Sequence, residues 1–272
     1  MDVLSEFKRP LRFFKRALRF LKRQVLGIRK TVPAGSLPVG AALSYGQAGE
    51  DRILAFLFGS LGIRQPSYID IGAHHPIYCN STYLFYSQGS HGVCVEPNPE
   101  FATALRTERP RDLVVEAGIV PIADQKLMYH MFREATFNTF SSEEAEIRIR
   151  HGGTGGNLLK IVEVVTLTLD QLMLSHFPHG VDLLAIDVEG LDESLLRHSQ
   201  LPIRPKLIMV ETVPFSNRHP VVKRMEIVRL MKGKGYQVVA DTYINTIFAD
   251  ESLVSIAECD VTDNSARMPG DF

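Results

Sequence analysis

A short apolar run, Tyr68-Ile69-Asp70-Ile71, passes directly into Gly72-Ala73, which is the pattern of a buried strand that ends in a tight turn. Similar apolar runs occur along the chain, and segments with helical spacing, such as residues 220–232, lie between them. They cover residues 92–95, 113–117, 161–166, 182–188, 206–211, 236–240 and 245–248. Short apolar strands that alternate with helices are typical of a mostly parallel sheet with helices on both faces. We therefore expect an α/β fold.

Acidic residues stand at the ends of these expected strands. They are Asp70, Glu96, Asp187, Glu189 and Glu211. In parallel α/β sheets, ligands bind beyond the carboxyl ends of the strands. We therefore expect the functional site at this edge of the sheet.

The first two expected strands indicate an adenosine-containing ligand. Gly72 allows a ligand to approach the backbone closely, and Glu96 has the position of an acidic residue that accepts hydrogen bonds from a ribose diol. The residues after Gly72 are Ala73-His74-His75-Pro76, so the glycines that usually bind a pyrophosphate are missing. This combination favours a ligand without phosphates, such as S-adenosylmethionine. A plain strand-to-helix turn is the alternative interpretation.

Three residues are candidates for a catalytic base. Asp187 and Glu189 are two positions apart at a strand end and therefore lie on the same side of the chain. His75 is a further candidate because the pKa of histidine lies near neutrality. We expect no metal site, but Asp187, Glu189 and Glu211 form an alternative set that could hold Mg²⁺. Capping and ion pairing by the same carboxylates is the other interpretation.

The composition limits the class of protein. The 272 residues are 45% hydrophobic, which is enough for one sizeable core, and no apolar stretch is long enough to span a membrane. The three cysteines form no Cys-x-x-Cys pair, which argues against a disulfide framework and favours a cytoplasmic location. The net positive charge lies in residues 1–32, and the remainder of the chain is net negative, so we expect no nucleic-acid partner.

Residues 1–32 carry ten Lys or Arg residues against Asp2 and Glu6, and their apolar residues recur every three or four positions. We expect a basic amphipathic helix whose residues 10–30 lie on an anionic membrane surface. One alternative is docking on the body or on a second copy of the chain, in a homo-oligomer. A coiled coil is another, although its apolar seam would be narrower than this face. Residues 33–43 contain two prolines and two glycines and predict a linker. Residues 44–255 then form the body, and 256–272 form a tail.

Motifs over residues 44–250 occur in the order in which the FkbM family of S-adenosylmethionine-dependent methyltransferases has them. They comprise residues 44–51 (SYGQAGED), 68–76 (YIDIGAHHP), 83–86 (YLFY), 95–99 (VEPNP), 138–140 (NTF), 186–190 (IDVEG), 205–211 (PKLIMVE) and 245–248 (NTIF). Each motif is short, and the ordered set carries the resemblance. It implies that residues 44–255 are a class I (Rossmann-like) methyltransferase domain. Such a domain has a seven-stranded, mostly parallel sheet whose last strand is antiparallel.

The resemblance also implies a set of cofactor-binding residues. By matched position, Asp70, Gly72 and Ala73 would line the methionine and ribose region, and Glu96 would hold the ribose diol. The residues facing the amino-acid end of the cofactor would be Gln47 and Glu50. Asp187 would lie beside the sulfonium, with Glu189 nearby.

The activity implied is O-methylation, commonly of a sugar hydroxyl in a bacterial polysaccharide or lipopolysaccharide, or in a glycosylated natural product. We expect in-line transfer to an alcohol oxygen, with Asp187, His75 or Glu189 as the base. A bound Mg²⁺ is the variant mechanism. Because glycans on lipid carriers lie at the cytoplasmic membrane face, the arm would make the enzyme a peripheral membrane protein. A nicotinamide-dependent oxidoreductase and a non-catalytic scaffold are the alternative functions.

Overall fold

The computed structural model describes residues 40–123, 126–188, 190–213 and 223–254. The predicted N-terminal helix, most of the predicted linker and the predicted tail at 256–272 lie outside these residues. Among the described residues, no helix combines the length and apolarity needed to cross a membrane.

Seven strands form the central sheet, in the order β10-β11-β9-β8-β1-β2-β3. They are β1 (Tyr68–Ile71), β2 (Gly92–Val95), β3 (Leu113–Val115), β8 (Leu183–Ile186), β9 (Leu207–Glu211), β10 (Tyr236–Asp241) and β11 (Asn245–Asp250). β11 is antiparallel to both of its neighbours, and the pairs from β9 to β3 are all parallel. This topology confirms the predicted seven-stranded, mostly parallel sheet with an antiparallel last strand.

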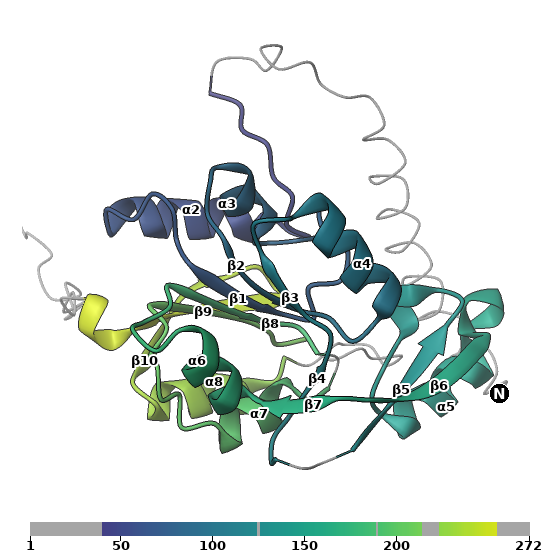
Figure 1. Cartoon of the computed structure of the whole chain (residues 1–272). Coiled ribbons are helices and arrows are strands. Elements are labelled where there is room, and N and C mark those ends of the chain that lie inside the picture. The colour runs from purple at the N-terminus through teal and green to yellow at the C-terminus, as the bar shows by residue number, and fades with distance from the viewer. Residues whose placement is uncertain (1–39, 124–125, 189, 214–222, 255–272) are drawn as a thin grey trace, which may run out of the picture.

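Helices cover both faces of the sheet (Figure 1). One face carries α2 (Glu50–Ser60), α3 (Tyr83–Ser87) and α4 (Pro99–Glu108), and the other carries α6 (Leu169–His176), α7 (Asp192–His198) and α8 (Met225–Gly233). Successive strand residues pack into separate cores, so that Ile69 and Ile71 of β1 belong to the core on the α6–α8 side and Tyr68 to the core on the α2–α4 side. Burial on both faces explains why the central strands are almost continuously apolar.

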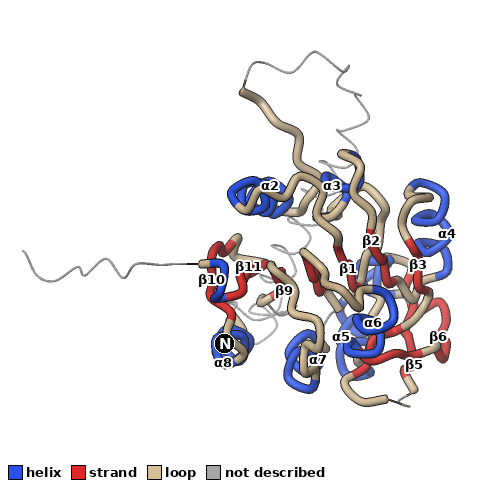
Figure 2. Tube along the Cα trace, turned by 60° about the vertical axis from the view of Figure 1, so that its left-hand side comes forward, coloured by secondary structure: helices blue, strands red, loops and turns tan. Residues whose placement is uncertain are grey.

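An insertion of residues 118–168 separates β3 from α6. It contains β4 (Gly118–Val120), β5 (Leu127–Phe132), η1 (Ala135–Phe137), α5 (Ser142–His151), η2 (Gly153–Gly156), β6 (Leu158–Val164) and β7 (Thr166–Thr168). β5 and β6 form an antiparallel hairpin, and β4 pairs with β7. Figure 1 shows β5, β6 and α5 together at one side of the molecule, and Figure 2 shows the β5–β6 hairpin there from a second direction.

Two predicted elements differ from the structure. The strand expected at 161–166 belongs to the β5–β6 hairpin and not to the central sheet; β6 carries exposed polar residues such as Lys160 and Glu163, which burial on both faces would not allow. The helix expected at 220–232 begins only at Met225, because Arg224 is not helical and donates its N–H to the carbonyl of Thr212, 2.7 Å away.

Candidate active site

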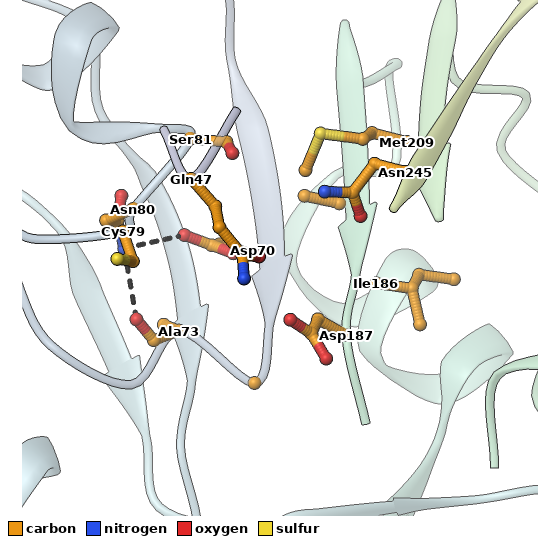
Figure 3. A pocket seen from close by; sticks show the side chains of 12 residues that line it. Gln47, Asp70, Ala73, Cys79, Asn80, Ser81, Ile186, Asp187, Met209 and Asn245 are labelled. Atoms are coloured by element: carbon orange, nitrogen blue, oxygen red, sulfur yellow. Dashed lines mark hydrogen bonds between the residues drawn. The ribbon is translucent and has the colours of Figure 1, made fainter. Parts of the chain in front are cut away.

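A cleft opens at the carboxyl ends of β1 and β8, where the sequence predicts the functional site. The empty volume of the cleft is about 410 Å³, which includes space open to solvent. Its lining residues are Gln47, Asp70, Gly72, Ala73, Cys79, Asn80, Ser81, Ala185, Ile186, Asp187, Met209 and Asn245. Figure 3 shows Asp70 and Asn80 on one side of this space and Asp187 and Asn245 on the other.

Gly72 sets how closely the two central strand ends approach. It has a φ of +80°, and its N–H donates to the carbonyl of Val95 at 3.0 Å. A Cβ at this position would lie 2.0 Å from the carbonyl oxygen of Asp187. Only glycine therefore fits this turn without moving the backbone on which Asp187 stands.

Asp70 presents a buried carboxylate to the cleft. Its Oδ2 accepts hydrogen bonds from the Thr82 hydroxyl at 2.7 Å and from the Asn80 amide at 3.3 Å. The Asn80 amide also donates to the carbonyl of Ala73 at 3.0 Å. Burial raises the pKa of Asp70, and the positive charge of Arg109 opposes that rise.

Glu96 follows β2 and is only 3% exposed. Its two oxygens accept the backbone N–H groups of His74 and Asn98, each at 2.8 Å. Burial raises the pKa of Glu96 to about 7, although both hydrogen bonds oppose the rise. Glu96 is not among the residues that line the cleft. It lies behind the turn at His74, whose ring packs on Phe101 with ring centres 4.0 Å apart.

Gln47 lines the cleft, whereas Glu50 is fully buried behind it. Oε1 of Glu50 accepts hydrogen bonds from the amide of Asn245 at 2.8 Å and from the hydroxyl of Thr242 at 3.0 Å. Its Oε2 accepts the N–H of Ala48 at 2.8 Å. Glu50 thus fixes the start of β11, and Asn245 is the residue that reaches the cleft.

The three candidate bases have different surroundings. Asp187 lines the cleft and is exposed. His75 does not line it; Nδ1 of His75 accepts the backbone N–H groups of Ile77 and Tyr78, each at 3.1 Å, and burial lowers the pKa of the ring. Glu189 lies outside the described residues.

The alternative metal set finds no support in the part of the chain that the structure describes. No group of three His, Cys, Asp or Glu side chains there is placed to hold a metal ion. Glu211, at the end of β9, is half-buried and does not line the cleft.

Several lining residues were not predicted, namely Cys79, Asn80, Ser81, Ala185, Ile186, Met209 and Asn245. Met209 and Asn245 lie inside sequence motifs already quoted, where they had no assigned role. Asn80 is harder to recognise as a site residue from the sequence, because it is an uncharged amide in the segment that connects β1 to α3.

The insertion meets the sheet beside the cleft. Oε2 of Glu144, in the first turn of α5, accepts hydrogen bonds from Arg148 at 2.9 Å and from the Thr139 hydroxyl at 3.1 Å. Its Oε1 lies 3.4 Å from the position that a Cβ on Gly190 would occupy. Glu144 therefore adjoins the loop that begins at Asp187.

Comparison with known proteins relates the chain to a family. The family model described as the methyltransferase FkbM domain matches residues 70–238, more than half of the chain. A search of curated protein sequences finds no significant match.

Solved structures of methyltransferases are also similar in outline. A TehB-like S-adenosylmethionine-dependent methyltransferase from Corynebacterium glutamicum is 10% identical, with 87% of this chain and 98% of that chain covered and a TM-score of 0.40. An O-methyltransferase from Bacillus cereus in complex with S-adenosylhomocysteine is 14% identical, with 89% and 90% covered and a TM-score of 0.37. These two likenesses are too distant to carry an argument about activity, and the family model decides the assignment. The chain belongs to the FkbM family of S-adenosylmethionine-dependent methyltransferases.

Proposed function

We propose that the chain is an O-methyltransferase that methylates a hydroxyl group of a carbohydrate, such as a sugar of a bacterial glycan or of a glycosylated natural product. The observation that carries the proposal is the position of Asp187. This exposed carboxylate stands at the end of β8, on a cleft whose opposite wall holds the buried Asp70. When bound, S-adenosylmethionine supplies a methyl group on an electrophilic sulfonium.

The polar residues of the cleft suit this cofactor. Asp70 is an acceptor for the cationic end of the molecule, and Gln47, Asn80 and Asn245 offer amides that can bind an amino-acid head group. The backbone at Gly72 and Ala73 provides close approach. We assign these residues to the methionine and ribose region.

Glu96 is assigned to the ribose. Its oxygens each accept one backbone hydrogen bond, and a carboxylate oxygen has two lone pairs. One acceptor position on each oxygen therefore remains for a hydroxyl group. Glu96 lies behind the turn at His74, so this turn must move for Glu96 to bind the ribose.

Asp187 is assigned two tasks in the transfer. It orients the acceptor hydroxyl and takes its proton as the oxygen forms its bond to the methyl group. His75 is less suited to this task. The lone pair on its Nδ1 already accepts two N–H groups, so the neutral ring carries its proton on Nε2 and presents a donor.

The insertion supports a polyhydroxyl acceptor. Glu144, which the hydroxyl of Thr139 holds, brings a carboxylate oxygen to the loop after β8. Carboxylates accept hydrogen bonds from hydroxyl groups, and a sugar presents several such groups at once. We place the acceptor between the insertion and Asp187.

The experiment compares Asp187→Asn with Asp182→Asn, a control at the opposite end of β8 whose side chain binds Ser67 and Lys206. Turnover is measured as S-adenosylhomocysteine formed with a panel of bacterial oligosaccharides, and binding by calorimetric titration with S-adenosylhomocysteine. We expect Asp187→Asn to lower turnover about 100-fold or more while binding changes by less than about threefold. Equal losses in turnover and binding would remove the proposed role. Binding without turnover on any oligosaccharide by the unaltered protein would favour the scaffold alternative or another acceptor class.

A further inference from the structure

A buried arginine lies behind the cleft. Arg109 follows α4 and is fully buried, and its Nε donates to Oδ2 of Asp112 at 2.7 Å. Asp112 also accepts hydrogen bonds from the hydroxyl of Tyr68 at 2.8 Å and from the N–H of Gly92 at 2.9 Å. A buried charge is tolerated only when its hydrogen bonds are satisfied. The remaining donors of the guanidinium therefore need partners.

Those partners connect Arg109 to the segment that lines the cleft. One terminal nitrogen donates to Oδ1 of Asn80 at 3.0 Å, and the other donates to Oγ1 of Thr82 at 2.9 Å. The second nitrogen also donates to the hydroxyl oxygen of Tyr68 at 3.0 Å. The planar fork of the guanidinium fixes these directions together, which a lysine ammonium cannot do.

The same two side chains bind Asp70. Arg109 occupies an acceptor position on the Thr82 oxygen, so the hydroxyl proton of Thr82 points away from Arg109. Its two acceptors are Oδ2 of Asp70 at 2.7 Å and Oδ1 of Asn80 at 2.9 Å, and the shorter contact is to Asp70. Oδ1 of Asn80 faces Arg109, so the amide nitrogen of Asn80 faces Asp70 at 3.3 Å. Thr82 and Asn80 thus bridge the buried arginine and the carboxylate of the cleft.

We propose that Arg109 is a positioning residue of the S-adenosylmethionine site, which acts through Thr82 and Asn80 to orient Asp70. The inference rests on the proposed function, because it assumes that Asp70 contacts the cofactor. Arg109 itself touches neither cofactor nor acceptor.

The charges around Asp70 give the proposal a measurable consequence. Burial raises the pKa of Asp70, Arg109 lowers it, and Asp112 raises it. Glu96 and the Cys94 thiol are the other titratable groups whose charges are coupled to that of Asp70, and Asp187 shares the cleft. Arg109 is the positive charge among these groups. Its removal should therefore raise the pKa of Asp70 further.

The experiment titrates S-adenosylhomocysteine into folded protein between pH 6 and 9. It uses Arg109→Met, Arg109→Lys and Thr82→Val. Arg204→Met is the matched control, since Arg204 binds Asp250 at 2.7 Å and the carbonyls of Lys234 and Gly235 at the other edge of the sheet. Thermal unfolding of each variant is recorded separately, so that a loss of stability is distinguished from a loss of affinity.

We expect Arg109→Met to bind at least about tenfold more weakly at pH 7, and the pH at which binding is half-maximal to rise. Arg109→Lys keeps the charge and should keep the pH profile, with weaker binding. Thr82→Val should weaken binding without removing the Arg109–Asp112 pair, and it is the decisive variant if Arg109→Met does not fold. Arg204→Met should lose stability only.

Unchanged affinity and pH profile in folded Arg109→Met, or in Thr82→Val if that variant alone folds, would overturn the proposal. So would the same loss of affinity in Arg204→Met. Absence of binding by the unaltered, folded protein would instead contradict the proposed cofactor site on which this inference rests.

Discussion

Replacing Gly72 by alanine tests whether the approach of β1 and β8 builds the site. An alanine Cβ would lie 2.0 Å from the carbonyl oxygen of Asp187, and Cβ contacts under 3.0 Å essentially never occur. The two strand ends would have to separate by about 1 Å, which strains the hydrogen bond from the N–H of Asp187 to the carbonyl of Ile71, 3.0 Å long.

The size of the effect follows from two separable terms. A left-handed φ costs an alanine about 1–2 kcal/mol. Forced separation adds about 1–3 kcal/mol of overpacking and about 1 kcal/mol of lost hydrogen bonding. We therefore expect the free energy of unfolding to fall by about 3–6 kcal/mol. S-adenosylhomocysteine should also bind at least about tenfold more weakly, because the backbone at Gly72 and Ala73, assigned to close approach of the cofactor, is displaced.

Gly62→Ala provides the matched control. Gly62 has a φ of +73°, and a Cβ there meets no atom within 4 Å. This variant should lose only the backbone contribution, about 1–2 kcal/mol of stability, and should bind S-adenosylhomocysteine with unchanged affinity. Urea denaturation gives the free energies, and calorimetry gives the affinities. If Gly72→Ala and Gly62→Ala lost the same stability and both bound normally, the reasoning about the strand ends would be refuted.

Three further outcomes follow from the structure. The pKa of Glu96 is raised from 4.5 to about 7 in the folded protein, so its protonated form favours folding. This contribution, about 3 kcal/mol, is complete below pH 4.5 and is lost as the pH rises to about 7. Denaturation against pH should show this slope, and Glu96→Gln should abolish it. Glu50→Gln weakens the hydrogen bond that positions Asn245 and should lower both stability and affinity for S-adenosylhomocysteine. A loss of affinity alone would instead place Glu50 in direct contact with the cofactor. Deletion of residues 1–32 should sharply reduce co-sedimentation with anionic vesicles and leave zwitterionic vesicles unaffected; undiminished binding would contradict the predicted membrane-binding arm.

The sheet was predictable because its strands carry a strong local signal. The residues of β1, β2 and β8 are buried on both faces, so their sequences are short apolar runs bounded by turn residues. The polar residue that ends such a run is also visible, which is why Asp70 and Asp187 could be placed at one edge of the sheet before the structure was known.

The insertion was harder to predict because β6 is only partly buried and mixes apolar with charged residues. No feature of such a sequence identifies the strand with which it pairs, and the pairing of β6 with β5 depends on tertiary packing. The starting point of α8 was obscured for a similar reason, since the backbone bond from Arg224 to Thr212 is invisible in the sequence.

Side chains that act across long sequence separations were not predictable. Glu50 was expected to contact the cofactor. It instead accepts a hydrogen bond from Asn245, 195 positions away, and supports that residue from a buried position. Arg109 likewise reaches Asn80 and Thr82 only because α4 packs over the β1–α3 connection. No local pattern marks either pair.

The most direct test of the central claim is calorimetric titration with S-adenosylhomocysteine of the unaltered protein, Glu96→Ala and Glu100→Ala. Glu100 is an exposed glutamate four positions along and controls for the loss of a nearby charge. We expect the unaltered protein and Glu100→Ala to bind equally, and Glu96→Ala to bind more weakly by about 1.5–3 kcal/mol, about ten- to a hundredfold. No binding by the folded, unaltered protein, or equal binding by Glu96→Ala, would contradict the assignment of this site to S-adenosylmethionine.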